Sequence, residues 1–244
     1  MTNHLSLGVC LLLAAFAFQV QARDLQVVTS VSTYGYLRDG QLTGPGTRVV
    51  ENTLEKASLD HYQMRVYPWA RAYEKALHEP NVLIYPIIRT TAREPLFKWV
   101  GEIVQAQNLF YRLRGPGTVK ASRLQDAKHY RIGVVRNDSR QAYLQDQGFT
   151  RLVVSSTSHE SFQKLLNHQV QLLPMSEREI RLLSEEAGVD FSRFEAVATL
   201  DEIPVGIYIA FSLDTPDEVV AQARVAFDQL KASGEIERLM RQDP

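Results

Sequence analysis

This chain has a single cysteine and almost no net charge. Its one cysteine, Cys10, lies in an apolar N-terminal run, so the chain beyond residue 22 has no disulfide, no thiolate metal site and no cysteine nucleophile. The 27 Lys and Arg residues nearly balance the 28 Asp and Glu residues, which gives a formal net charge of −1. This balance provides no basic field for nucleic acid and no polybasic patch for an anionic membrane. We therefore expect a small or local partner.

Motifs for metal binding and for common hydrolases are also missing. The histidines beyond residue 22 never recur at the i, i+4 spacing of a helical metal pair. The segment SSTSHES lacks a surrounding Gly-x-Ser-x-Gly turn, and GPGTR lacks the lysine of a phosphate loop. We expect no metal, no cofactor and no catalytic residue of these kinds. The histidines are His61, His78, His129, His159 and His168.

Residues 1–22 have the pattern of a secretory signal. The run LSLGVCLLLAAFAF carries no charge, and the small residues Val20 and Ala22 stand at the −3 and −1 positions of a cleavage before Arg23. The pattern predicts export to the periplasm and no stable membrane insertion after cleavage. An uncleaved N-terminal anchor is the alternative, because the run falls just short of a comfortable membrane span.

Strand and helix periods alternate after the signal. Residues 25–31, 62–68 and 82–88 are predicted strands, and residues 47–59 and 69–77 are helices with one apolar face. The strand at 82–88 is apolar throughout, which suits the middle of a parallel sheet. This β-α-β-α-β order predicts an open, mostly parallel sheet with helices on both faces.

A second series of the same kind begins at residue 131. Its strands are expected at 131–135, 151–156 and 170–175. Each following helix opens with a capping pair, and a last strand precedes a helix expected to be capped by Thr215 with Glu218. The three pairs of the second series are Asp138 with Gln141, Thr157 with Glu160, and Ser176 with Glu179.

The two series predict two lobes. An extended segment around Glu102 to Asn108 can carry the chain from one lobe to the other, and the last strand and helix can return it. Two such crossings make a hinge and a cleft. We expect a signal at 1–22, the first lobe at 23–104, the second lobe at 105–203, and a return to the first lobe at 204–244.

Four segments in this order resemble the bacterial extracellular solute-binding proteins of family 3, which deliver polar amino acids and similar solutes to ABC transporters. They are STYGYLRDGQLTG, PIIRTTAREPLFKWVG, YRIGVVRNDS and GIYIAFSLDTPDE with LKASGEIERLM. The resemblance covers essentially the whole chain after the signal. It implies an α/β, two-lobed type II periplasmic binding protein fold, with two mostly parallel sheets flanked by helices and joined by two crossover strands.

The resemblance assigns roles to residues near the third strand. In the family, an arginine shortly after this strand holds the ligand carboxylate, and Arg93 matches that position. Thr90 matches a position that donates a hydrogen bond to the same carboxylate. The alternative is that Arg93 pairs with Glu94 or Glu102 at the surface. We expect Arg89 to be structural.

Aromatic and second-lobe residues complete the implied site. Tyr34 or Tyr36 and Trp69 match places from which family members clamp the ligand body between ring faces, although they can also be core-edge residues. Ser139 matches the hydroxyl that bonds the ligand from the second lobe, and Arg136 beside it can add a positive contact. The alternative for this helix start is plain capping.

One feature departs from the family pattern. Amino-acid binders carry an acidic residue that accepts the ligand α-ammonium, and Gln171, Met175 and Ser176 stand at the corresponding places here. Glu177 and Glu179 lie further into the helix. Without a carboxylate an ammonium is desolvated with little compensation, so an ordinary α-amino acid is in doubt.

The sequence therefore predicts a monomeric periplasmic solute-binding protein. It would close on a small carboxylate ligand, an amino acid or related organic acid, and present it to an ABC transporter permease or a membrane sensor. The alternative is a secreted enzyme on the same fold, a cyclohexadienyl-dehydratase-like lyase, with Glu102 or Glu202 as the acid. An interaction domain with a collapsed cleft is a third possibility.

Overall fold

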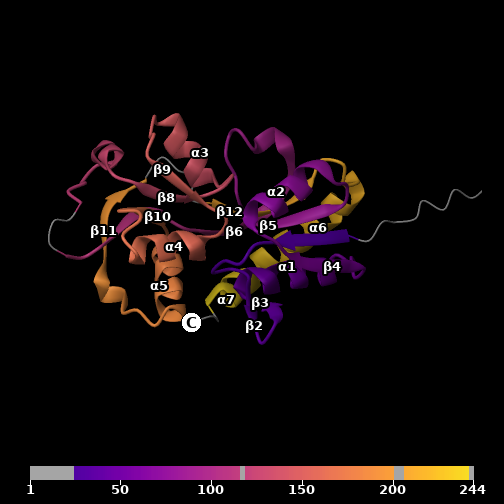
Figure 1. Ribbon diagram of the computed structural model, residues 1–244. Coiled ribbons are helices and arrows are strands. Elements are labelled where there is room, and N and C mark those ends of the chain that lie inside the picture. The colour runs from indigo at the N-terminus through magenta and orange to yellow at the C-terminus, as the bar shows by residue number, and fades with distance from the viewer. Residues whose placement is uncertain (1–24, 116–118, 201–205, 242–244) are drawn as a thin grey trace, which may run out of the picture.

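The computed structural model describes residues 25–115, 119–200 and 206–241. The predicted signal at 1–22 lies outside the described residues. Figure 1 shows two groups of strands and helices side by side, with α1, α2 and α6 in one and α3, α4 and α5 in the other. No helix within the described ranges is long and apolar enough to cross a membrane.

The first lobe is built on a five-stranded mixed sheet. Its strand order is β4 (Tyr62–Val66), β1 (Leu25–Thr29), β5 (Val82–Ile88), β12 (Gly206–Ser212) and β6 (Phe97–Gln105). Strands β4, β1 and β5 are parallel, as the alternating periods predict. Strand β12 runs antiparallel to both β5 and β6, which brings the C-terminal part of the chain back into this sheet.

Helices cover both faces of this sheet because its buried strands are apolar on both sides. Val27 faces one core cluster with Val50 of α1 and Phe227 of α6, whereas its neighbour Val28 faces another with Ala72 of α2. The helices are α1 (Pro45–Lys56), α2 (Trp69–His78), α6 (Asp217–Ala232) and α7 (Glu235–Arg241). A small hairpin of β2 (Tyr36–Arg38) and β3 (Gln41–Thr43) precedes α1.

The second lobe differs from the mostly parallel sheet that we expected. Strand β7 (Leu109–Leu113) lies between β10 (Leu173–Met175) and β11 (Phe194–Thr199), antiparallel to both. A separate pair, β8 (Ile132–Val135) and β9 (Leu152–Ser155), is parallel. Burial on both faces makes a strand apolar in either direction, so the sequence pattern identified these strands without their direction.

The second-lobe helices begin where the capping residues predict. Asp138, Thr157 and Ser176 accept hydrogen bonds from the backbone N–H groups of their own first turns. The helices are α3 (Ser139–Asp146), α4 (Ser158–Leu166) and α5 (Glu177–Glu186), with short 3₁₀ turns η1 (Glu94–Leu96), η2 (Leu124–His129) and η3 (Phe191–Arg193).

The predicted cap of α6 is wrong. Pro216 is the N-cap residue, and no side chain caps this helix. The hydroxyl of Thr215 is instead hydrogen-bonded to that of Ser212 at 3.0 Å. A proline fixes the backbone for the first helical turn without a hydroxyl cap, so the Thr-Pro pair permits either start.

The chain passes from the first lobe to the second between β6 and β7, across residues 106–108. The second passage, between β11 and β12, runs through residues 201–205, which are not among the described residues. Strands β6 and β12 belong to the first-lobe sheet, whereas β7 and β11 belong to a second-lobe sheet, which agrees with two crossings between the lobes. The boundaries at residues 105 and 203 stay a prediction.

Candidate functional site

A cavity of about 350 Å³ lies between the lobes. This volume is at the small end of the roughly 300–1,000 Å³ typical of small-molecule sites. The first lobe contributes the loop after β1, the start of α2 and the turn after β5, and the second lobe contributes the starts of α3, α4 and α5. The polar and charged lining residues are Ser30, Ser32, Thr33, Tyr34, Tyr67, Trp69, Arg93, Asn108, Asp138, Ser139, Arg140, Ser156, Thr157, Ser158, Ser176 and Glu179.

Arg93 lines this cavity with only 7% of its surface exposed. Its Nη1 donates to the carbonyl of Ile88 at 3.1 Å, and its Nη2 donates to that of Asn137 at 3.0 Å. The guanidinium also lies 4.9 Å from the ring centroid of Tyr73 and 5.4 Å from that of Trp69. Two of its five N–H donors are thus used within the described chain, and the other three have no hydrogen-bond partner there.

Surface pairing of Arg93 with Glu94 or Glu102, the alternative raised above, does not occur. Glu94 accepts hydrogen bonds from Arg89 at 2.6 and 2.5 Å, and Glu102 accepts one from the Tyr208 hydroxyl at 2.9 Å. Within the described ranges Arg93 has no ion pair. Arg89 is the half-exposed, structurally paired arginine of the two, as predicted.

Three of the predicted site residues lie outside the cavity lining. The Thr90 hydroxyl accepts a hydrogen bond from the backbone N–H of Arg93 at 3.2 Å, which shapes the turn that carries the guanidinium. Tyr36 lies on the β2–β3 hairpin, and Arg136 is exposed beyond β8. A ligand contact from any of these three is a prediction that the geometry does not favour.

Tyr34, Trp69 and Ser139 do line the cavity, and each is more than nine-tenths buried. Burial raises the pKa of Tyr34, so its hydroxyl is neutral near pH 7. The Ser139 hydroxyl has no hydrogen-bond partner in the part of the chain that is described. It is therefore free to bond a ligand.

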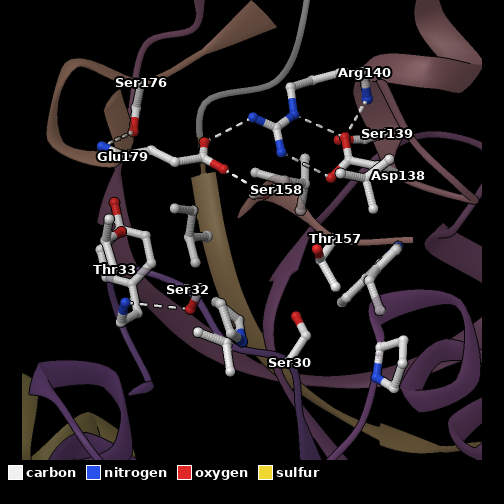
Figure 2. Close-up of a pocket in the computed structure, with 18 of the residues that line it drawn as sticks. Ser30, Ser32, Thr33, Asp138, Ser139, Arg140, Thr157, Ser158, Ser176 and Glu179 are labelled. Carbon is white, nitrogen blue, oxygen red and sulfur yellow. Dashed lines mark hydrogen bonds and ion pairs between the residues drawn. The ribbon is translucent and has the colours of Figure 1, made fainter. Parts of the chain in front are cut away.

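An ion cluster of Asp138, Arg140 and Glu179 forms the second-lobe wall (Figure 2). Arg140 bonds Asp138 through Nε at 2.9 Å and through Nη2 at 3.1 Å. Its Nη1 bonds Glu179 at 2.8 Å and the carbonyl of Pro174 at 2.9 Å. Burial by itself would raise the pKa of Asp138, but the charge and hydrogen bonds of Arg140 outweigh it and hold that pKa below its usual value. Ser158 donates to the other oxygen of Glu179 at 2.7 Å.

The sequence reasoning missed two charged residues that line the cavity, Arg140 and Glu179. The spacing of Ser176 and Glu179 predicted a capping box, and Ser176 does cap α5, but the Glu179 side chain turns into the cavity. The expectation that no acidic residue reaches the site is therefore wrong. The Ser-x-x-Glu pattern does not distinguish a glutamate that caps its helix from one that enters the cavity. The partner that decides this, Arg140, lies 39 residues away in the sequence.

One backbone carbonyl, that of Asn137, accepts hydrogen bonds between the lobes. Asn137 has a φ of 60°, which asparagine tolerates better than most residues. Its carbonyl accepts hydrogen bonds from Trp69 Nε1 at 2.9 Å and from Arg93 Nη2 at 3.0 Å. Both donors come from the first lobe and both also line the cavity, so closure of the lobes and the shape of the cavity depend on the same side chains.

The site has the composition of a small-molecule binding pocket: one cation with free donors, aromatic rings and many hydroxyls. No cluster of His, Cys, Asp and Glu suited to a metal ion occurs in the described chain. No family model matches the sequence, and no curated protein matches it.

Solved structures establish the fold as that of the periplasmic binding proteins. The arginine-, lysine-, histidine-binding protein ArtJ of Geobacillus stearothermophilus superposes with a TM-score of 0.77 at 15% identity, over 90% of this chain and 94% of its own. A periplasmic binding protein of Salmonella typhimurium with high arginine specificity gives 0.75 at 18% identity, over 91% and 99%.

A third match is a histidine kinase sensor domain with similarity to periplasmic binding proteins, at a TM-score of 0.76 and 15% identity, over 89% of this chain and 94% of that domain. The resemblance drawn from the sequence motifs is thus confirmed for the fold, and the predicted two-lobed α/β class is confirmed with it. Identities this low do not carry a ligand from one protein to another.

Proposed function

We propose that this chain is a periplasmic solute-binding protein that closes on a small carboxylate ligand. Arg93 carries the proposal, since it is a largely buried cation in the interlobe cavity with three N–H donors that have no hydrogen-bond partner and with no ion pair in the described chain. The charge of Asp138 acts on Arg93 but is paired with Arg140, so a ligand carboxylate would supply the direct counter-charge that Arg93 lacks. The size of the cavity suits a molecule of a few carbon atoms bearing polar groups.

Binding would join the lobes through the ligand. Its carboxylate would accept a pair of hydrogen bonds from Arg93, each worth about 1.5–3 kcal/mol because the partners are charged. Ser139 would donate from the other lobe. A ligand that contacts both lobes binds the closed state better than the open one, so it shifts the population toward closure.

The closed form would be recognised by a membrane partner. The similar structures include transport binding proteins and a kinase sensor domain, so both an ABC transporter permease and a membrane sensor are consistent with the proposal. Periplasmic location follows from the N-terminal signal pattern. We propose a monomer because ligand contacts from both lobes are available within one chain.

A thermal-shift screen of organic acids and amino acids tests this proposal. A ligand that binds the folded protein raises the melting temperature, and the shift grows with the logarithm of the ratio of ligand concentration to dissociation constant. Any hit should then be titrated against Arg93→Ala, which we expect to lose about 100-fold or more in affinity. Arg89→Ala is the matched control, because it removes an arginine from the same turn that is paired with Glu94. Full affinity in Arg93→Ala would show the site assignment to be wrong.

A lyase of the cyclohexadienyl dehydratase kind has less support. Glu102 does not line the cavity and its carboxylate is bonded to Tyr208, while Glu202 falls outside the described residues. Incubation with prephenate or arogenate distinguishes the two functions. Formation of an aromatic product at a useful rate would replace the binding proposal.

A further inference from the structure

Hydroxyl groups dominate the polar part of the cavity. Eight of its lining residues are serine or threonine, and they come from both lobes. In Figure 2, Ser30, Ser32 and Thr33 lie on the side opposite the row of Asp138, Arg140 and Glu179. The eight are Ser30, Ser32, Thr33, Ser139, Ser156, Thr157, Ser158 and Ser176.

Several of these hydroxyls have an O–H hydrogen available for a ligand. The oxygen of Ser32 accepts two backbone N–H groups at 3.2 Å, so both of its lone pairs are used and toward a ligand it can only donate. The oxygens of Thr157 and Ser176 each accept one backbone N–H group, at 3.1 and 3.2 Å, and keep one lone pair beside the O–H hydrogen. The starts of α3, α4 and α5 also meet at this wall, and their first N–H groups and dipoles favour negative charge.

Two buried polar side chains add to this. Ser139 is 6% exposed and Asn108 is 7% exposed, both line the cavity, and neither has a side-chain hydrogen bond within the described chain. The polar side-chain atoms of both residues stay in contact with solvent, so each can exchange a water for a ligand atom. Both side chains can donate a hydrogen bond, which extends the donor surface from α3 to the segment between the lobes.

The two carboxylates do not offset this excess of donors. Asp138 takes three hydrogen bonds from Arg140, two from the guanidinium and one from its backbone N–H. Glu179 takes one from Arg140 and one from Ser158, so each of its oxygens keeps a lone pair but its negative charge is already paired with Arg140. An α-ammonium carries three donors and no acceptor, and at this wall it would meet mainly other donors.

Cations of the chain also lie against the aromatic rings of the cavity. A ring that faces a guanidinium or ammonium gives up the attraction that a cationic ligand would use on that face. The pairs are Trp69 with Arg93 at 5.4 Å, Tyr34 with Arg178 at 5.7 Å, and Tyr67 with Arg71 at 4.9 Å and Lys75 at 5.7 Å.

We infer that the ligand is a small hydroxy or oxo carboxylic acid that carries neither an ammonium nor any other cationic group. The inference rests on the proposed binding function and names its substrate class. The carboxylate lies on Arg93, and the hydroxyl or carbonyl oxygen accepts from the hydroxyls at the starts of α3, α4 and α5. The arginine bound by the similar structures does not fit, because its α-ammonium and guanidinium would both face donors and cations.

Calorimetric titration with isosteric acid pairs tests the inference. The pairs are L-malate with L-aspartate, L-2-hydroxyglutarate with L-glutamate, and L-glycerate with L-serine, and L-arginine is added as a further probe. We expect the hydroxy acid of at least one pair to bind about tenfold or more tightly than its amino partner, because an unmatched buried hydrogen-bonding group is strongly rejected. Tighter binding of the amino member, or binding of L-arginine, overturns the inference and leaves the proposed function standing. No binding of any acid in the wider screen overturns both.

The substitution Ser158→Ala tests the reason for the preference. It removes the hydroxyl that occupies Glu179 and so frees one carboxylate oxygen for an ammonium. We expect the affinity ratio of hydroxy acid to amino acid to fall about threefold or more, whereas Ser158→Thr keeps the hydroxyl and the ratio. A ratio unchanged by Ser158→Ala would contradict the role given to Glu179. Melting temperatures without ligand show whether each variant is folded.

Discussion

The two walls of the cavity each hold a buried arginine, and the two are treated in opposite ways. Arg93 in the first lobe donates to two carbonyls, lies against two rings and forms no ion pair in the described residues. Arg140 in the second lobe is bonded to two carboxylates at once. Arg93 is stabilised by neutral carbonyls and rings and still has N–H donors without a hydrogen-bond partner in the described chain, whereas the charge of Arg140 is neutralised by carboxylates of the protein. One residue type can thus provide a binding site or a structural support, and its partners decide which.

Removal of the structural arginine should have the largest effect. Arg140→Gln leaves Asp138 and Glu179 side by side without their shared counter-charge, which we expect to cost about 3–5 kcal/mol of unfolding free energy. Urea denaturation without ligand measures it. Arg238→Gln on α7 is the control, because its ion pair with Glu235 is exposed and should contribute much less. Equal losses in the two variants would contradict the contrast between buried and exposed pairs.

Acid should weaken the second lobe through Asp138. Its pKa is lower in the folded protein than in the unfolded chain, so the stability it contributes is complete above about pH 4 and is lost as the pH falls through the folded pKa. Each unit of that shift is worth about 1.4 kcal/mol. Asp138→Asn keeps a helix-capping acceptor but cannot titrate, so its unfolding free energy should fall less between pH 5 and pH 2.

The exposed Asp228 of α6 gives the matched control for this pH series. Asp228→Asn should follow the wild-type profile, since this residue lies on the solvent face of its helix. An Asp138→Asn profile that coincides with the wild type would show that the ion cluster does not govern acid stability.

Local patterns made most of the fold predictable from the sequence. The strands of the first lobe, the helix starts at Asp138, Thr157 and Ser176, and the exit of β5 toward Arg93 each depend on residues within one turn or one strand. The antiparallel direction of β7 was not predictable, because a doubly buried strand is apolar whichever way it runs.

The site was predictable in part for the same reason. Arg93 follows a buried strand, so its burial could be inferred from neighbouring residues. The contact of Arg140 with Glu179 joins α3 to α5 across the lobe, and no spacing in the sequence reports it. The resemblance to family 3 pointed to Arg93, which lines the cavity, but also suggested that acidic residues were absent, which the cluster at the second wall corrects.

The contact between the lobes allows a smaller perturbation. Trp69→Phe keeps a ring beside Arg93 but removes the Nε1 donor to Asn137, which we expect to weaken closure by about 1 kcal/mol, or roughly fivefold in ligand affinity. Small-angle scattering without ligand should show a larger radius of gyration for this variant than for the wild type. Trp99→Phe is the control, because its Nε1 bonds the carbonyl of Glu94 within the same lobe. A loss of affinity in both variants alike would mean that ring packing, and not the interlobe bond, is responsible.

The smallest effect is expected at Ser139, where the second-lobe wall would meet the ligand of Arg93. Its hydroxyl has no partner in the described chain, so Ser139→Ala should leave the melting temperature of the ligand-free protein unchanged. Ligand affinity should still fall by about threefold, which corresponds to one weak neutral hydrogen bond. Ser233→Ala, which removes an exposed hydroxyl at the end of α6, should change neither quantity. If Ser139→Ala bound the ligand with full affinity, the start of α3 would not be a ligand contact, and Arg93 would act with the starts of α4 and α5 alone.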